Sequence, residues 1–346
     1  MKRISVCGHF GFGKELLNGQ TIKTKIITDA LRREYGEERL AMIDTQGGVK
    51  KLPQILFSLS VSILRGDNIV ILPAYNGLRV IVPFLHGLNR AFHRRIFYVV
   101  IGGWLPTYLD DKPSLLQQIK DLSGIFVETE SMKDALRKKG FENVRVLPNC
   151  KELIIVEDRY RKTNDGPVKL CTFSRVMKEK GIEDAIKAVM FLNQQGKDPI
   201  YTLDIYGQTE PSQQEWFNQL MLSCPTYIQY KGLISFDRST EVLKDYFALL
   251  FPTYHSGEGF AGTLIDAMAA GLPVIASDWR YNAEIVQENQ IGCLVDPHNT
   301  EALADAIRHL SADADRYAYY RSNCLSNAHK YLPENAIRVL IDAIGA

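Results

Sequence analysis

Short apolar runs alternate with amphipathic helical patterns along the chain, and this alternation constrains the fold more than any other feature. The runs are apolar on both faces, which is typical of strands buried in a parallel sheet. The order of strand, helix and strand predicts the α/β class with doubly wound parallel sheets. The expected strands are Ile4–Cys7, Asn68–Leu72, Ile96–Ile101, Ile125–Glu128, Val144–Leu147, Val168–Phe173, Tyr201–Tyr206, Ile228–Tyr230, Ala248–Phe251, Val274–Ala276 and Gly292–Val295.

The length of the chain predicts two domains. Its 346 residues exceed what one hydrophobic core usually supports. Residues 151–167 are polar and charged without clear periodicity, so we expect them to link a domain of residues 1–150 to one of residues 168–332, with a last helix over 333–346. Two doubly wound halves joined in this way would place a ligand cleft between them, at the carboxyl ends of the strands.

Charge and cysteine usage exclude several classes of function. The net charge of +1 gives no overall field that would attract a nucleic acid. The six cysteines are scattered, without a C-x-x-C pair, and are expected to be reduced core residues rather than disulfides or ligands of a structural metal. No apolar run is long enough to span a bilayer, and the glycine-rich N-terminus does not fit a signal peptide. We therefore expect a cytoplasmic protein.

The strongest local signal is a pair of acidic residues, Glu258 and Asp266, eight positions apart around a glycine-rich turn. Phe251 and Pro252 close a strand before the turn, and Thr263 can cap the helix that follows. A strand, turn and helix in this order direct free N–H groups and the positive end of the helix dipole at an anion such as phosphate. Alternatively, Asp266 only complements the helix dipole and Glu258 is a solvated loop residue. The pattern alone leaves both interpretations open.

The segment EGFAGTLIDAMAAGLPVIASD resembles the signature of the retaining glycosyltransferases of family four. These enzymes have the GT-B fold, in which two Rossmann-like domains face each other across a cleft. The resemblance implies that Glu258 approaches the transferred sugar and that Asp266 binds the ribose hydroxyls. Asp266 departs from the usual glutamate and is one methylene shorter. Further donor contacts are implied for Gly262, Thr263 and Leu264 in the turn and the helix start.

A second motif, FSRVMKEKGIEDAIKA, resembles the family's strand-end arginine and the lysine that follows it, here Arg175 and Lys180. Two fixed cations can stabilise a diphosphate leaving group without a metal, so no metal cofactor is expected. Ser174 stands where the family usually has glycine. The alternative is that residues 178–180 form a solvated helix entry, although Arg175 directly follows an apolar strand.

Three weaker signals occur in the family's order. Gly207 resembles the glycine at a strand end beside the nucleotide, and Gly232 with Leu233 resembles the strand end whose backbone holds the base. The dipeptide Pro148-Asn149 resembles the close of the N-terminal domain. The resemblance thus covers most of residues 120–300, and it implies that the last helix crosses back onto the N-terminal domain.

The N-terminal loop contains Gly8, Gly11 and Gly13 directly after a strand. Its spacing does not match G-x-G-x-x-G and no helix begins promptly, which argues against a dehydrogenase. The resemblance implies instead that Gly11 and Gly13, with Gly19 further along, lie under the donor phosphates. His9 is a candidate for substrate contact, with a purely structural role as the alternative.

The acceptor side is expected near Gly103 and Trp104, in the segment YVVIGGWLP. Many members of the family have a histidine at this strand end, and the present chain has no evident side-chain base there. A retaining mechanism can proceed without one, because the departing phosphate oxygen can accept the proton. Trp104 and Tyr108 could stack on an acceptor sugar, or pack in the core.

Two segments, residues 50–65 and 77–95, combine apolar and basic side chains. They could lie on an anionic membrane near a lipid-linked acceptor. The alternative is two helices that cover the sheet and carry basic outer faces.

Together the motifs predict a retaining hexosyltransferase of bacterial polysaccharide or glycan biosynthesis. It would transfer sugar from a UDP- or GDP-sugar to a saccharide or lipid-linked saccharide, in the cytoplasm or at the inner face of the membrane. The alternatives are a GT-B sugar-nucleotide 2-epimerase and a GT-B partner subunit that has lost activity.

Overall fold

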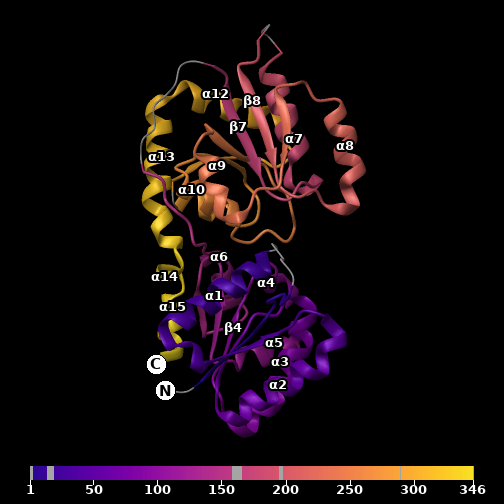
Figure 1. Cartoon of the computed structure of the whole chain (residues 1–346), viewed down its shortest axis with the longest axis vertical. Helices are drawn as coiled ribbons and strands as arrows, with labels where there is room; N and C mark the ends of the chain where they lie inside the picture. The colour runs from indigo at the N-terminus through magenta and orange to yellow at the C-terminus, as the bar shows by residue number, and fades with distance from the viewer. Residues whose placement is uncertain (1–2, 14–18, 158–165, 195–197, 289, 346) are drawn as a thin grey trace. The chain divides into compact units, whose positions relative to one another are not determined.

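The computed structural model describes residues 3–13, 19–157, 166–194, 198–288 and 290–345. The chain divides into two compact units, the first made of residues 1–151 and 331–346 and the second of residues 152–330. Each unit is built on one sheet (Figure 1). Part of the expected linker, residues 158–165, lies outside the described residues.

The first unit contains a six-stranded parallel sheet in the order β2-β1-β3-β4-β5-β6. Its β1 strand is buried at every position, as expected for a strand flanked by β2 and β3 and covered on both faces. The strands are β1 Ile4–Gly8, β2 Leu40–Asp44, β3 Asn68–Ile71, β4 Ile96–Val99, β5 Gly124–Val127 and β6 Val144–Val146.

Helices connect the parallel strands of this sheet, and each begins after the carboxyl end of the strand before it. Figure 1 shows α2, α3 and α5 grouped along one side of the unit. The helices are α1 Gly19–Tyr35, α2 Leu52–Arg65, α3 Tyr75–Phe92, α4 Leu105–Tyr108, α5 Pro113–Lys120, α6 Glu130–Lys138, α14 Pro333–Ala336 and α15 Arg338–Gly345, with 3₁₀ turns η1 Glu37–Arg39 and η2 Gly48–Lys51 and, at the boundary between the units, η6 His329–Tyr331.

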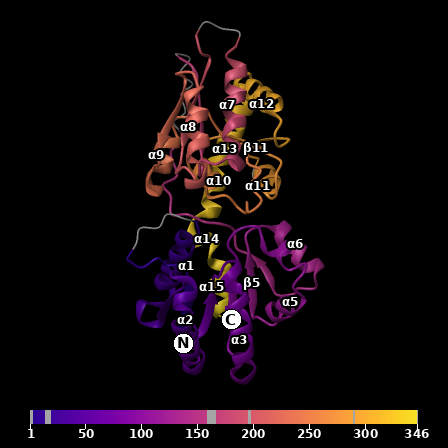
Figure 2. The same cartoon turned by 90° about the vertical axis from the view of Figure 1, so that its right-hand side faces the viewer.

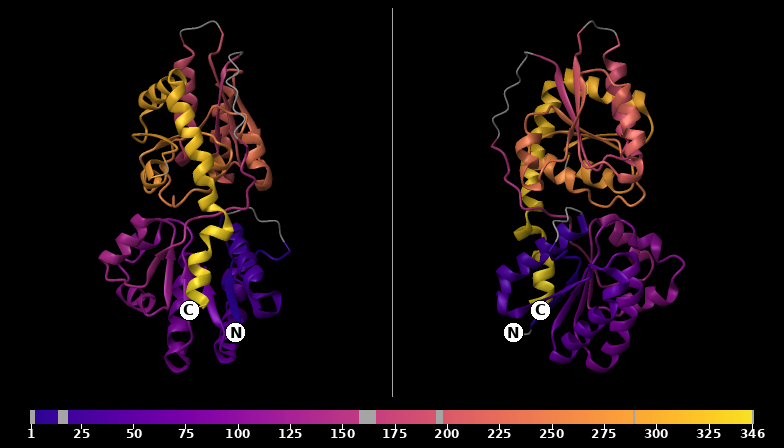
Figure 3. Two further views of the ribbon diagram at one scale, coloured as in Figure 1. Left: turned by 90° about the vertical axis from the view of Figure 1, so that its left-hand side faces the viewer. Right: turned by 45° about the vertical axis from the view of Figure 1, so that its right-hand side comes forward.

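The C-terminal residues 331–346 belong to the first unit, where α15 packs against α1 (Figures 2 and 3). Leu340 and Ile341 share one apolar core with Ile27 and Leu31 of α1. Hydrogen bonds complement this packing. The Tyr35 hydroxyl donates to the carbonyl of Ile341 at 3.0 Å, and the Arg95 guanidinium donates to the carbonyls of Ala343 and Ile344 at the end of α15.

The second unit contains another six-stranded parallel sheet, in the order β12-β11-β10-β7-β8-β9. Its strands are β7 Val168–Phe173, β8 Tyr201–Tyr206, β9 Ile228–Gly232, β10 Ala248–Phe251, β11 Val274–Ser277 and β12 Gly292–Val295. Its helices are α7 Ile182–Leu192, α8 Gln214–Leu222, α9 Ser239–Leu243, α10 Gly262–Ala269, α11 Asn282–Glu288, α12 Thr300–Ala312 and α13 Ala314–Ala328, with 3₁₀ turns η3 Lys178–Lys180, η4 Pro211–Gln213 and η5 Phe236–Arg238.

The predicted α/β class with parallel sheets is confirmed in both units. Strand β2, Leu40–Asp44, was not among the expected strands. It lies at the edge of the sheet, where only Leu40 and Ile43 are buried. None of the described helices is both long and apolar enough to cross a bilayer.

Candidate active site

The second sheet reverses its strand order next to β7. Strand β7 lies between β8 and β10. The chain continues from β7 to β8 and β9 on one side of β7, and it then returns to β10 on the opposite side. In an open parallel sheet, ligands bind at the carboxyl ends of the strands beside such a reversal. The segments that follow β7 and β10 there are residues 174–181 and 252–262, and they contain Arg175, Lys180, Glu258 and Gly262.

A glycine fixes how closely these two segments approach each other. Gly181 follows the η3 turn with φ of 69°, a conformation that favours glycine. A Cβ atom at this position would lie 2.1 Å from the carbonyl oxygen of Pro252, just after β10. Only glycine allows this contact, and the contact brings Lys180, the preceding residue, to the end of β10.

Lys180 and Glu258 form a largely buried ion pair. The Lys180 Nζ atom lies 2.5 Å from Glu258 Oε2, and the two side chains are 13% and 7% exposed. The hydroxyl of Thr253 lies 2.8 Å from the same carboxylate oxygen, and the lysine also lies over the ring of Phe251. The structure thus brings together two residues that the sequence motifs predicted separately. A carboxylate this buried is stable because it is paired and hydrogen-bonded.

The loop between β10 and α10 is held by contacts that the sequence did not suggest. Ser277 of β11 donates to the carbonyl of Thr253, and Trp279 donates through Nε1 to the carbonyl of His255 at 2.8 Å. The half-buried His255 lies near the ion pair. Burial lowers the pKa of His255 below its usual value, and the Lys180 cation adds to this effect. Both effects favour the neutral imidazole, which can donate a hydrogen bond to a polar ligand or accept one from it.

Helix α10 presents its N-terminus beside this loop. Its N-cap residue is Ala261, which offers no side-chain acceptor to the first N–H groups, those of Gly262 and Thr263. The Thr263 hydroxyl oxygen is buried and has no hydrogen-bond partner among the described residues. Such an end, with Leu264 in its first turn, has the polarity to bind an anion.

Asp266, predicted to reach the ribose, lies inside the unit. It is 2% exposed, and the Ser239 hydroxyl of α9 donates to its Oδ1 atom at 2.7 Å. Its carboxylate therefore connects α10 to α9 in this structure. The ribose contact was implied by the family resemblance, whereas in the structure the side chain lies against α9.

Arg175 points to a different partner from Lys180. Its guanidinium lies 3.1 Å from the carboxylate of Glu210, which follows β8, and the arginine side chain is 55% exposed. An exposed pair of this kind is weak and can be exchanged for a ligand anion. Glu210 had no signal in the sequence beyond its place after a strand.

The predicted glycines lie at neighbouring strand ends. Gly207 has φ of 132°, and a Cβ atom there would lie 1.8 Å from the Ser174 carbonyl oxygen, so glycine is required where β8 passes β7. Its N–H donates to the carbonyl of Gly232 at 2.9 Å. Gly232 faces open space, and Leu233 is 55% exposed. These residues form an accessible rim at the ends of β8 and β9.

In the first unit, the glycine-rich loop binds a carboxylate of its own chain. Asp44, at the end of β2, accepts the N–H groups of Phe10, Gly11 and Phe12 at 3.0, 3.4 and 3.1 Å. Burial alone would raise the pKa of Asp44, but these donors together with the Gln46 N–H hold it below the usual value. Gly11 therefore already has an acceptor. Gly13, at φ of 80°, has open space around its Cβ position.

The remaining acceptor-side candidates also lie in the first unit. His9 bonds to Thr21 through Nδ1 at 2.7 Å. Gly103 precedes Trp104, which is only 7% exposed, donates to the carbonyl of Ile101 and packs at 4.1 Å between ring centroids against Tyr75. Tyr75 is 42% exposed, so the accessible ring of this cluster is one that the sequence did not single out.

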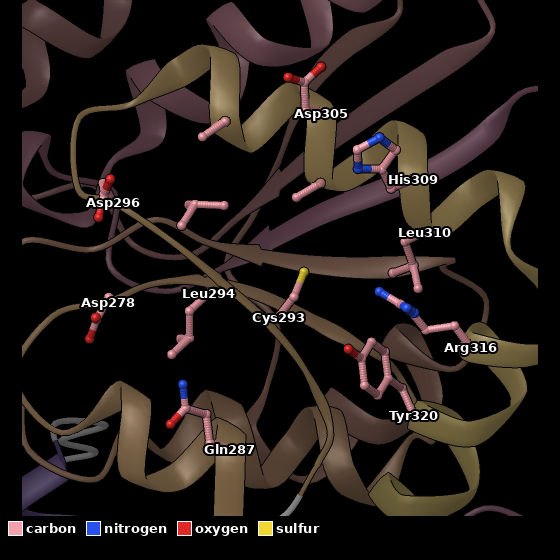
Figure 4. Close-up of a pocket in the computed structure, with 13 residues that line it drawn as sticks. Asp278, Gln287, Cys293, Leu294, Asp296, Asp305, His309, Leu310, Arg316 and Tyr320 are labelled. Atoms are coloured by element: carbon pink, nitrogen blue, oxygen red, sulfur yellow. The ribbon is translucent and has the colours of Figure 1, made fainter.

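A separate pocket of about 490 Å³ lies beside β12, the edge strand, and contains none of the predicted site residues. Asp278 and Asp296 line one side of it, and Arg316 and Tyr320 the other (Figure 4). Within the described parts of the chain, no three His, Cys, Asp or Glu side chains gather closely enough to hold a metal ion.

The chain matches one protein-family model and is similar over part of its length to curated glycosyltransferases and sucrose-phosphate synthases. Residues 157–327 match the family model of the glycosyl transferases group 1. The chain is 30% identical over 168 residues to the UDP-N-acetylglucosamine–peptide N-acetylglucosaminyltransferase GtfA subunit of Streptococcus pneumoniae, covering 48% of this chain and 31% of that protein. It is 40% identical over 74 residues to sucrose-phosphate synthase 4 of Arabidopsis thaliana, covering 21% and 7%. The matched regions thus span less than a third of either relative.

Two solved structures resemble the chain over its whole length. HepE of Anabaena in complex with UDP has a TM-score of 0.74 at 14% identity, covering all of both chains. The sucrose-phosphate synthase of Thermosynechococcus elongatus has a TM-score of 0.77 at 17% identity, covering 100% of this chain and 98% of that one. At these identities the likeness shows the shared GT-B fold.

Proposed function

We propose that this protein transfers a sugar from a nucleoside diphosphate sugar to a saccharide acceptor with retention of the anomeric configuration. The match of residues 157–327 to the family model of the glycosyl transferases group 1 supports the sugar transfer. The observation that carries the proposal is the Lys180–Glu258 pair, 2.5 Å apart at the strand reversal and next to the start of α10. Retention and the residue roles rest on the motifs around Arg175, Lys180 and Glu258.

In this proposal the diphosphate binds at the start of α10. The N–H groups of Gly262 and Thr263 and the unpartnered Thr263 hydroxyl supply donors, and Lys180 supplies a fixed cation. An entering diphosphate would compete with Glu258 for Lys180, and with Glu210 for Arg175. The carboxylate of Glu258 would then be available for the hydroxyls of the donor sugar.

The transfer step follows from these positions. The bond between the anomeric carbon and the phosphate oxygen breaks, and its electron pair stays on that oxygen. The acceptor hydroxyl attacks from the same face, and its proton passes to the departing phosphate oxygen. Lys180 stabilises the charge that develops on the diphosphate, in a site where burial strengthens the interaction.

Within the first unit, Tyr75 is the residue that we propose for contact with an acceptor saccharide. An exposed aromatic ring packed on Trp104 and Tyr108 offers a rigid apolar surface for the face of a sugar ring. A free or a lipid-linked saccharide would present the same face.

Ligand binding provides the first test. We expect a thermal-shift screen of UDP, GDP, ADP and their sugars to find at least one ligand that raises the unfolding temperature, since ligand in excess stabilises the native state. Lys180→Ala should abolish the shift, whereas Lys178→Ala should retain it, because Lys178 lies in the same turn but over the ring of Trp216. The absence of a shift with every nucleotide would reject the proposal. Conversion of the donor in the absence of an acceptor would favour the epimerase alternative.

A further inference from the structure

We propose that the outer face of α2, with the η2 turn before it, is a docking surface for a membrane that contains anionic lipids. This surface, here called the α2 face, consists of the apolar residues Val49, Pro53, Phe57 and Leu64 and the basic residues Lys50, Lys51 and Arg65. The inference does not depend on the proposed reaction, since these residues lie on a different element from every residue of the candidate active site.

Exposure of large apolar side chains marks the surface. Val49, Phe57 and Leu64 are 85%, 70% and 64% exposed, and they are three of the five most exposed large apolar residues in the described chain. Pro53, Phe57 and Leu64 are four and seven positions apart, so they share one side of the helix. The opposite side carries Ile55, Leu59 and Ile63, which are buried. The helix therefore has two apolar sides, and packing within the unit accounts for only one.

The chain segment that contains this face carries surface charge of a single sign. Between Asp44 and Asp110 the chain contains seven lysines and arginines but one acidic residue, Asp67. Asp67 is 2% exposed and accepts a hydrogen bond from Ser5, so no carboxylate from this stretch reaches the surface. A tract this long with a net positive surface is suited to a negatively charged partner.

The cations lie at both ends of the apolar strip. Lys50 and Lys51 precede α2 in η2, and Arg65 is its last residue. All three are exposed, and none forms an ion pair within the described parts of the chain. By contrast, Arg94 and Arg95 in the following segment donate to carbonyls of α2 and α15 and have structural roles.

A lipid surface fits this combination better than another protein or a nucleic acid. Exposed Phe and Leu side chains between lysines and arginines can enter the acyl boundary while the cations remain among the headgroups. A nucleic acid would use the cations but not the apolar strip. The acidic Asp111 and Asp121, near Arg79 and His86, limit the surface on the α5 side.

The test is cosedimentation of the full chain with vesicles of phosphatidylcholine, with and without phosphatidylglycerol. We expect sedimentation only with the anionic vesicles, and less of it at high salt, because each basic side chain near the surface contributes about fivefold in partitioning. Binding to neither vesicle, or equally to both, would overturn the proposal.

Substitutions in the α2 face test whether this face is the one that binds the membrane. Phe57→Ser with Leu64→Ser, and separately Lys50→Glu with Lys51→Glu, should each reduce vesicle binding at least about tenfold. The matched controls are Leu222→Ser, at an 80% exposed site of the second unit, and Lys25→Glu with Lys244→Glu. Unchanged thermal unfolding would show that the variants fold. The assignment would be overturned if the α2-face variants bound vesicles as well as the control variants do. It would also be overturned if the chain formed a dimer that the Phe57→Ser and Leu64→Ser substitutions dissociate.

Discussion

At the residue scale, the proposed chemistry depends on one buried contact, between Lys180 and Glu258. Each residue stands in a motif that is informative from sequence alone, but their contact requires Gly181 to lie against Pro252, which no local pattern indicates. The roles of Arg175 and Asp266 were predicted by the same resemblance. In the structure Arg175 pairs with Glu210 and Asp266 bonds to Ser239, partners that are distant in sequence.

Replacement of Lys180 tests the role of this cation. Lys180→Ala should lower the rate of sugar transfer by about 10²–10³, the usual effect of removing one fixed donor to a charge that develops in the transition state. Lys178→Ala should change the rate little. Transfer rates of both variants under saturating donor provide the measurement, and equal rates for Lys180→Ala and the wild type would refute the assignment.

A second residue-scale prediction concerns Asp44. Because its pKa is lowered in the folded state, its ionised form contributes stability that is present above the unfolded pKa, near 4, and is lost as the pH falls through the folded value. Asp44→Asn should therefore unfold at a lower denaturant concentration than the wild type at pH 7, and the difference should shrink in acid. The exposed Asp134→Asn provides the control. A difference that does not depend on pH would contradict this account.

At the element scale, most strands could be predicted because buried parallel strands are continuous apolar runs. The exception, β2, is an edge strand, and the helix expected after Pro333 is divided into α14 and α15 at Ile337. The positions of the loops were predictable, but the distant residues that form hydrogen bonds with them were not. The carboxylate in the glycine-rich loop comes from Asp44, more than thirty residues away.

Two glycines test whether the close contact between Gly181 and the backbone of Pro252 requires glycine. Gly181 and Gly232 both have left-handed φ values, 69° and 77°, but only Gly181 lacks room for a Cβ atom. Gly232→Ala should cost about 1–2 kcal/mol of unfolding free energy from backbone strain. Gly181→Ala should cost about 1–3 kcal/mol more, because the Pro252 backbone must move. Denaturation of both variants checks this, and equal costs would rule out the steric explanation.

At the scale of the whole molecule, the C-terminal segment matters because residues 331–346 complete the core of the first unit. Leu340 is fully buried in the cluster that includes Ile27 and Leu31. Leu340→Ala should therefore lower the unfolding free energy of the first unit by about 2–5 kcal/mol. Arg338→Ala, at a 59% exposed site, should have an effect within about 0.5 kcal/mol. Calorimetry measures the unfolding transition of each variant. Similar unfolding free energies for both variants would contradict the conclusion that Leu340 packs in the core of the first unit.

We propose that the protein transfers sugar from a nucleotide donor with retention. The most direct measurement is proton NMR of the wild-type protein with UDP- and GDP-sugars and a pool of saccharide acceptors. We predict a new glycosidic anomeric signal with the configuration of the donor, formed as the nucleoside diphosphate is released and absent with Glu258→Gln. A product of inverted configuration, or a donor that is only epimerised or left intact with every acceptor, would rule out the proposed function.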